Sequence, residues 1–164
     1  MRAVIQRVTN ASILINQKLV TAIGPGLCIL LGISRDDTIR DVEYMAQKIV
    51  HLRLYEGKPT RSVMDLDYEI LCQSQISLYN KLKGNKVSFR NAMDPKYSND
   101  LFKQMLQRLR EIYKPSKIKE GKFGGHKEMT LVNNGPFTVI LESPKTSEQR
   151  SSDLLKANNL KNKV

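Results

Sequence analysis

The sequence is poor in the residues that hold disulfides and metals. It has no tryptophan, two cysteines and two histidines among 164 residues. Cys28 and Cys72 both lie in apolar runs, so we interpret them as buried thiols in a reducing compartment such as the cytoplasm. Without a CxxC pair or a histidine cluster, we expect no zinc site and no other metal.

Long apolar runs are missing as well. None approaches the roughly 20 residues that a membrane-spanning helix needs. The first twelve residues, MRAVIQRVTNAS, are interrupted by polar side chains too early for a secretory signal. We therefore expect a cytoplasmic protein without a membrane span.

The usual catalytic motifs are also lacking. The sequence contains no GxSxG, HExxH, P-loop or dinucleotide fingerprint, and we expect no cofactor. His51 lies at a predicted helix end and His126 in a glycine-rich turn, and neither belongs to a recognisable nucleophile–base motif. If the protein is an enzyme, its backbone is the remaining resource: amides can stabilise an oxyanion, and carbonyls can hold an amine.

Acidic residues are scarce relative to basic ones. The 27 lysines and arginines exceed the 16 acidic residues, for a net charge of +11. Between residues 81 and 127, thirteen basic residues oppose four acidic ones. This excess favours a polyanionic partner such as a nucleic acid. A lysine-rich solvated surface that binds nothing is the alternative.

Apolar patterning predicts an α+β domain. Strands are expected at residues 2–8, 11–15, 19–23, 27–33, 52–56, 68–78, 128–132 and 137–141. Helical spacing predicts helices at 39–51 and 96–113, and residues 80–94 are expected to form a polar loop. We predict a curved, barrel-like β-sheet with two main helices packed outside, spanning residues 1–144. The polar composition of residues 145–164 predicts a mobile basic tail.

Two stretches could supply backbone groups to a site. One is Ser74–Ser77 (SQIS), where polar residues close an apolar strand; a solvated strand end is the alternative. The other is NNGPFT, residues 133–138. Its glycine permits close approach to the backbone, and a cis bond before Pro136 would reorient two carbonyls. A tight turn explains the same residues, so both interpretations stay open.

Together, and in this order, the two stretches resemble the D-aminoacyl-tRNA deacylases, formerly called D-tyrosyl-tRNA deacylases. The resemblance covers roughly residues 1–144 and includes MRAVIQRV, IGPGLCILLGI, KIVHLRLYE, SVMDLDYEIL, LKGNK, KIKEGKFG and LESP. It implies a homodimer with its active site at the subunit interface and aminoacyl-tRNA as substrate. The implied reaction hydrolyses the ester of D-aminoacyl-tRNA in translation quality control, with glycyl-tRNA mischarged on tRNA-Ala as a further candidate substrate.

The resemblance also implies site residues. The family's Ser-Gln-x-Thr motif is matched by Ser74, Gln75 and, with serine in place of threonine, Ser77. These are the implied catalytic residues, with nearby amides stabilising the oxyanion. The Asn-x-Gly-Pro-x-Thr motif is matched in full, and its implied role is a chiral filter in which a cis Gly-Pro bond reaches into the partner's pocket. The implied substrate-binding residues are Asn133, Gly135, Pro136, Thr138, Ile76 and Phe89. Candidates for tRNA phosphates are Lys83, Lys86 and Arg90, with the helix at 96–113.

The sequence departs from the family pattern near the implied pocket. The family has other residues at Ile76, Ser77, Arg90, Lys127 and Phe137. These differences bear on substrate range and turnover rather than on the fold. Two alternative functions follow: a sibling deacylase with relaxed chiral or amino-acid specificity, and a non-catalytic tRNA- or nucleic-acid-binding homologue.

Overall fold

A computed structural model describes residues 1–145 of the chain. The predicted tail, apart from Lys145, lies outside the described residues. The strands are β1 (Arg2–Ile15), β2 (Lys18–Ile23), β3 (Gly26–Gly32), β4 (Arg53–Tyr55), β5 (Arg61–Ser62), β6 (Glu69–Ser74), β7 (Lys81–Lys83), β8 (Lys86–Ser88), β9 (Ile118–Glu120) and β10 (Glu128–Glu142). The helices are α1 (Ile39–His51) and α2 (Pro95–Ile112), and two 3-10 turns are η1 (Ile76–Tyr79) and η2 (Pro115–Lys117).

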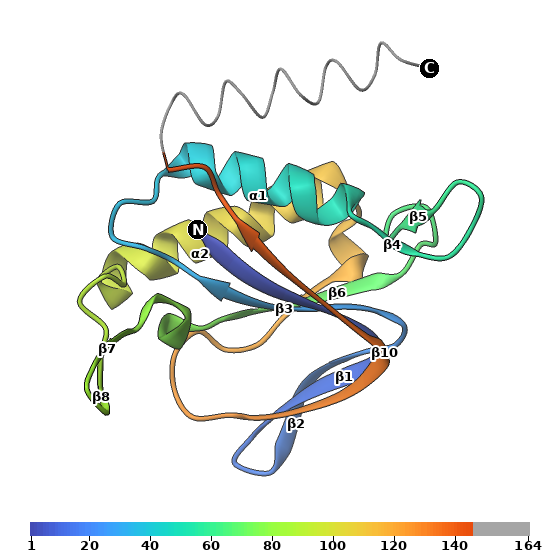
Figure 1. Ribbon diagram of the computed structural model, residues 1–164. Helices are drawn as coiled ribbons and strands as arrows, with labels where there is room; N and C mark the ends of the chain where they lie inside the picture. The colour runs from blue at the N-terminus through green and yellow to red at the C-terminus, as the bar shows by residue number, and fades with distance from the viewer. Residues whose placement is uncertain (146–164) are drawn as a thin grey trace.

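One strongly curved, mixed sheet organises the fold. Its order is β10-β1-β3-β6-β9, and β2 pairs with the second half of β1 (Figure 1). β6 is parallel to both β3 and β9, whereas β1 is antiparallel to β2, β3 and β10. The predicted barrel-like α+β fold is confirmed.

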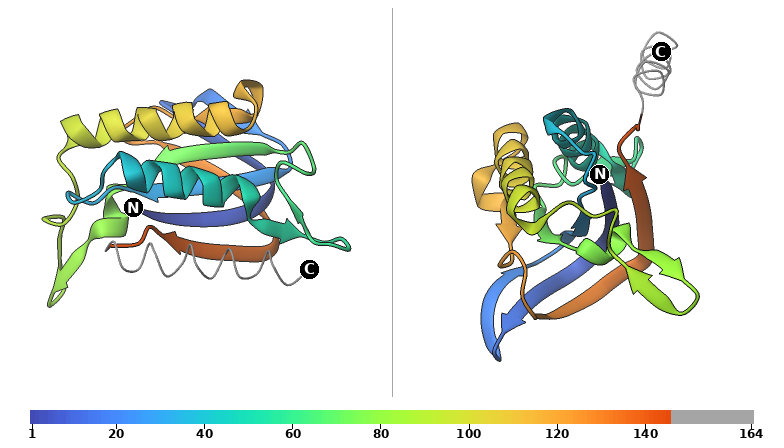
Figure 2. Two further views of the ribbon diagram at one scale, coloured as in Figure 1. Left: turned by 90° about the horizontal axis from the view of Figure 1, so that it is seen from above. Right: turned by 90° about the vertical axis from the view of Figure 1, so that its left-hand side faces the viewer.

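The two helices lie side by side on one face of the sheet (Figure 2). Their apolar stripes and the facing strand residues form the main core, in which Met45, Ile49, Phe102 and Met105 are almost fully buried. A smaller core on the opposite face contains Val8, Ala11, Ile13, Ile23, Cys28 and Leu71. β3 contributes to both cores, as its continuous apolar run predicts.

Five details differ from the sequence-based prediction. The strands expected at 2–8 and 11–15 form one strand, which is interrupted by register shifts between Gln6 and Asn10. Ordinary alternation places Ile5 in the main core and Val8 in the smaller one. The shift after Val8 changes the face to which the following side chains point, so Ala11 joins Val8 in the smaller core. Residues 128–132 and 137–141 likewise belong to one strand, β10.

The other three differences concern short elements. The strand expected at 68–78 ends at Ser74 and continues as η1. The expected loop at 80–94 contains the β7–β8 hairpin, and the three-residue strand β9 was not predicted at all. Strands of three residues are too short to produce a recognisable apolar period.

Candidate active site

A cavity of about 260 Å³ opens beyond the end of β6. Ser74 is the last residue of that strand, and the chain then turns into η1. The cavity wall is mostly apolar, from residues Leu31, Ile33, Ile76, Met93, Pro95 and Phe123; its polar lining comes from Ser74, Gln75, Ser98 and Lys127. The first predicted motif therefore borders a hollow large enough for part of a small ligand.

One backbone amide of this motif, that of Gln75, already has a hydrogen-bond acceptor within the protein. The amide of Gln75 donates to the carbonyl of Leu31 at 2.8 Å, so it extends the β3–β6 pairing and is not free for a ligand. The first bond of η1 runs from the Leu78 amide to the Gln75 carbonyl. The amides of Ile76 and Ser77 precede that bond and have no acceptor within the turn. These two are the candidate oxyanion donors.

Side chains hold this turn in place. Nε2 of Gln75 donates to Oγ of Ser77. The neighbouring Gln73, which is almost fully buried, donates to the carbonyls of Ser74 and Lys122 at 3.3 and 3.4 Å. Gln73 thus connects the end of β6 to the glycine-rich segment on the other side of the cavity. The sequence analysis did not identify Gln73, because a glutamine within an apolar strand carries no signal of its contacts.

NNGPFT forms an exposed bulge in β10. Asn133 pairs with Val8 and Thr138 with Gln6, so residues 134–137 stand outside the ladder opposite the single residue Arg7. All six residues of the motif are exposed, and the Gly135–Pro136 peptide bond is cis. The segment is neither a hairpin turn nor part of the core, because the strand continues on both sides of it.

Arg7 supports the bulge from the neighbouring strand. Its Nε donates to the carbonyl of Asn134 at 2.9 Å, and Nη1 donates to the carbonyl of Leu54. Its guanidinium also lies 5.2 Å from the centre of the Phe137 ring, within the range of a cation–π contact. Sequence reasoning missed Arg7, since an arginine in a half-buried strand shows no pattern that reveals its partners.

The two motifs do not meet within one chain. Across β1 and β3, Thr138 is level with Leu71 on β6, and Ser74 lies three residues beyond Leu71. Three strand spacings of about 4.8 Å and three to six residues at about 3.3 Å each place the bulge roughly 20 Å from Ser74–Ser77. No residue of 133–138 lines the cavity.

The candidate tRNA contacts lie on or beside the β7–β8 hairpin. Lys83, Lys86 and Arg90 are exposed, and the two lysines face each other across the hairpin register. Phe89, predicted to bind the substrate, follows β8 and is exposed as well. Within residues 1–145, no ion pair involves either lysine. These positive charges are therefore available to a partner.

At the end of α2 and in the segment after it, the basic side chains are paired with acidic ones. Arg108 pairs with Glu43 and Glu111, Arg110 with Glu120, and both Lys114 and Lys117 with Asp67. These acidic partners neutralise the cations and tie α2 to α1 and to the loop before β6. The candidate tRNA contacts that remain are therefore the cations of the hairpin and those cations of α2 that have no acidic partner among the described residues.

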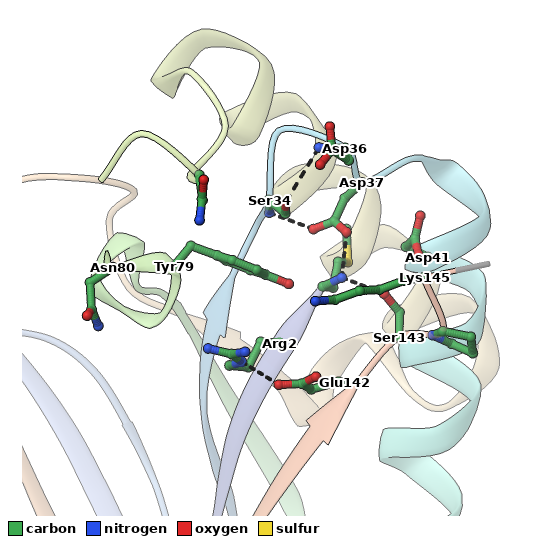
Figure 3. A pocket seen from close by; sticks show the side chains of 13 residues that line it. Arg2, Ser34, Asp36, Asp37, Asp41, Tyr79, Asn80, Glu142, Ser143 and Lys145 are labelled. Carbon is green, nitrogen blue, oxygen red and sulfur yellow. Dashed lines mark hydrogen bonds and ion pairs between the residues drawn. The ribbon is translucent and has the colours of Figure 1, made fainter. Parts of the chain in front are cut away.

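A second cavity, of about 360 Å³, lies where β1 begins and β10 ends (Figure 3). Several charges at its wall already have partners: the Met1 ammonium contacts Asp37 and Ser143, and Arg2 contacts Glu142. Burial raises the pKa of Asp37, against the opposing effect of the ammonium. This arrangement joins the ends of two strands to the loop before α1, and we interpret it as structural.

Among residues 1–145, no three His, Cys, Asp or Glu side chains are grouped so as to hold a metal ion. No helix in the same range is long and apolar enough to span a membrane.

Known proteins resemble this chain over almost its whole described length. Residues 4–142 match the family described as D-Tyr-tRNA(Tyr) deacylase. The chain belongs to this family. D-aminoacyl-tRNA deacylase of Drosophila melanogaster is 49% identical over 156 residues, which are 93% of this chain and 97% of that protein. D-aminoacyl-tRNA deacylase 1 of Homo sapiens is 45% identical over 148 residues, or 88% of this chain and 71% of the relative.

Two solved structures share the fold of this deacylase-family chain. One, titled c-Myc DNA Unwinding Element Binding Protein, has a TM-score of 0.84 at 45% identity and covers 88% of this chain and 99% of its own. The other, titled as a structural analysis of a probable eukaryotic D-amino acid tRNA deacylase, has a TM-score of 0.74 at 18% identity over 87% of this chain and 98% of that one. At that identity, the second match bears on the fold alone.

Proposed function

We propose that the protein hydrolyses the ester bond of D-aminoacyl-tRNA and releases the free D-amino acid and tRNA as a step of translation quality control. One observation supports the proposal: the two stretches that resemble the family's motifs border a cavity, at Ser74–Ser77, and form an exposed backbone bulge, at Asn133–Thr138. The names of its relatives support the same activity.

A second copy of the chain completes the site in this proposal. The two halves lie roughly 20 Å apart in one chain by strand geometry. β10 is an edge strand, and besides the bulge it exposes Val132 and Ile140, the latter with 68% of its surface accessible. Exposed apolar side chains on a strand edge are typical of an interface. In a homodimer, each bulge would enter the cavity of the other subunit.

The chemistry then rests mainly on the backbone. Water attacks the ester carbonyl, the carbon–oxygen bond to the ribose breaks, and the tRNA leaves with a free hydroxyl group. The amides of Ile76 and Ser77 stabilise the oxyanion, and the terminal ribose 2′-hydroxyl assists in activating the water. Ser74 and Gln75 shape the cavity and the turn. Carbonyls around Gly135 and Pro136 hold the α-amino group, and Asn133, Thr138 and Phe89 complete the substrate contacts.

The first test is paired hydrolysis of D-tyrosyl-tRNA and L-tyrosyl-tRNA. We expect rapid loss of the D ester while the L ester stays intact, and a Pro136→Ala variant is expected to discriminate less. Unchanged discrimination in the variant argues against the filter.

Loss of both esters with the wild-type protein favours the sibling deacylase with relaxed specificity, for which Phe137 in the bulge is the specific observation. Salt-dependent tRNA binding without any hydrolysis favours the non-catalytic homologue. Adding mischarged glycyl-tRNA-Ala to the same assay defines the substrate range.

The shared site has its own test, in which two inactive chains are mixed. One chain carries Ile76→Pro, which removes an amide from the cavity. In the other, residues 134–137 are replaced by a single alanine, which leaves a regular ladder with that alanine opposite Arg7. Random pairing of the two chains restores one complete site in half of the dimers, so about a quarter of wild-type activity is expected. An inactive mixture of folded chains shows that one subunit does not complement the other.

A further inference from the structure

Among residues 1–145, Lys127 is the one charged side chain that lines the cavity beside Ser74–Ser77. It lies in the segment between the glycine-rich turn and β10, and it is partly buried, unlike its neighbours His126 and Glu128. The opposite wall comes from β3, η1 and the start of α2, whose contributions are mostly aliphatic. The lysine therefore brings a positive charge into a largely apolar space.

The ammonium of Lys127 has no counter-charge in the part of the chain that the structure describes. No ion pair or hydrogen bond involves its Nζ atom. Burial is the sole cause that lowers the pKa of this lysine, and no neighbouring carboxylate offsets it. A partly desolvated cation without a partner is unfavourable unless a bound ligand supplies the missing negative charge.

Resting on the proposed function, we propose that Lys127 is a substrate-binding residue, whose ammonium pairs with an anionic oxygen of the bound aminoacyl-tRNA end. Two parts of that end carry such oxygens: the side-chain carboxylate of an aspartyl or glutamyl ester, and the phosphate next to the terminal adenosine. A carboxylate partner gives the enzyme a preference for acidic D-amino acids. A phosphate partner instead strengthens binding of every aminoacyl-tRNA equally.

Three non-hydrolysable ligands separate these sources. Each is an adenosine whose 3′-hydroxyl is replaced by an amide to a D-amino acid: D-aspartyl-adenosine, its neutral isostere D-asparaginyl-adenosine, and D-asparaginyl-adenosine 5′-monophosphate. Their affinities are measured by calorimetry for the wild-type protein and for Lys127→Met, Lys127→Arg and Lys122→Met. Lys122 is the matched control because it lies in the same segment, is exposed and does not line the cavity.

We expect Lys127→Met to weaken one anionic ligand by about tenfold or more, as for the loss of a charge-assisted hydrogen bond, and to leave the neutral ligand unchanged. Selective weakening of the aspartyl ligand assigns the carboxylate, and selective weakening of the monophosphate assigns the phosphate. Lys127→Arg should retain most of the affinity, and Lys122→Met all of it. Equal affinities of wild type and Lys127→Met for all three ligands, or no binding of either anionic ligand by the wild type, overturn the proposal.

Hydrolysis of D-tyrosyl-tRNA, measured on the same preparations, separates this failure from failure of the proposed function. If the wild-type protein hydrolyses the ester but the Lys127 variants bind all three ligands as tightly as wild type, only the proposed role of Lys127 is excluded. Absence of turnover removes the deacylase activity, while the calorimetric comparison still decides whether the cavity recognises anions.

Discussion

Ile76 occupies the first position of η1, where its amide has no acceptor within the turn. Proline is tolerated at such a position, and the preceding Gln75 already has the extended backbone that proline favours. Ile76→Pro therefore removes one N–H with little disturbance of the fold. If this amide stabilises the oxyanion, the turnover of D-tyrosyl-tRNA should fall by about 100-fold or more. Ile76→Val, which keeps the amide, should stay within a few-fold of wild type; equal rates for the two variants exclude the amide as a donor.

Arg7 supports the bulge through its guanidinium, which donates to two carbonyls from different parts of the chain. Lysine keeps the charge but cannot donate to both in this fixed geometry. We expect Arg7→Lys to lower the preference for D over L esters by about tenfold. Both hydrolysis rates are compared with those of Arg53→Lys, whose side chain contacts the carbonyl of Thr60 in the β4–β5 hairpin. A selectivity that drops equally in both variants means that Arg7 has no special role at the bulge.

At the scale of elements, the pairing of β3 with β6 depends on Gly26. A Cβ atom on Gly26 would lie 1.9 Å from the backbone carbonyl oxygen of Glu69, whereas one on Gly24 meets nothing closer than 3.8 Å. We expect Gly26→Ala to lower the free energy of unfolding by about 3 kcal/mol or more, because backbone cannot retreat as a flexible side chain can. Gly24→Ala is the control and should be nearly neutral. Denaturant unfolding of both proteins makes the comparison, and similar stabilities would contradict the close approach.

The start of α1 depends on Asp41, whose carboxylate accepts from the amide and hydroxyl of Thr38. Burial acts to raise the pKa of Asp41, but hydrogen bonds from Thr38 and Ser143 outweigh it, and the net pKa is lowered. A carboxyl with a lowered folded-state pKa stabilises the fold above its unfolded pKa of about 3.9. This contribution disappears as the pH falls through the lower folded value.

Asp41→Asn should accordingly cost about 1–2 kcal/mol of unfolding free energy at pH 7. The difference from wild type should shrink when the same unfolding experiment is run below about pH 4. Asp36→Asn is the matched control, since the Asp36 side chain is 84% exposed. A difference that stays constant from pH 7 to pH 3 would show that the charge of Asp41 is not what stabilises the helix start.

For the whole molecule, the distribution of paired and unpaired cations decides which face attracts tRNA. Lys83→Gln combined with Lys86→Gln removes two unpaired charges from the β7–β8 hairpin. We expect weaker tRNA binding and a salt dependence of log K that is less steep by roughly 1.5. The same net charge is removed by Lys114→Gln with Lys117→Gln, two lysines that already pair with Asp67. Affinity measured at several salt concentrations should change much less for that control pair.

The pattern of apolar residues along the chain by itself determined the two helices, the long strands and the α+β class. Burial of one face imposes a period that the sequence must carry, and Met45 or Ile29 can be placed in the core on that basis. The motifs at Ser74–Ser77 and Asn133–Thr138 were also identifiable, because polar and turn-forming residues there interrupt or end apolar runs.

Only the tertiary structure decided how those motifs are used. That Arg7 supports the bulge, that the Gln75 amide is taken by Leu31, and that Lys127 enters the cavity all depend on contacts between residues far apart in the chain. The same holds for the basic segment, where Arg108 and Lys117 have acidic partners and the hairpin lysines have none among the described residues. Such contacts leave no period in the sequence, because they depend on which strands and helices the fold brings together.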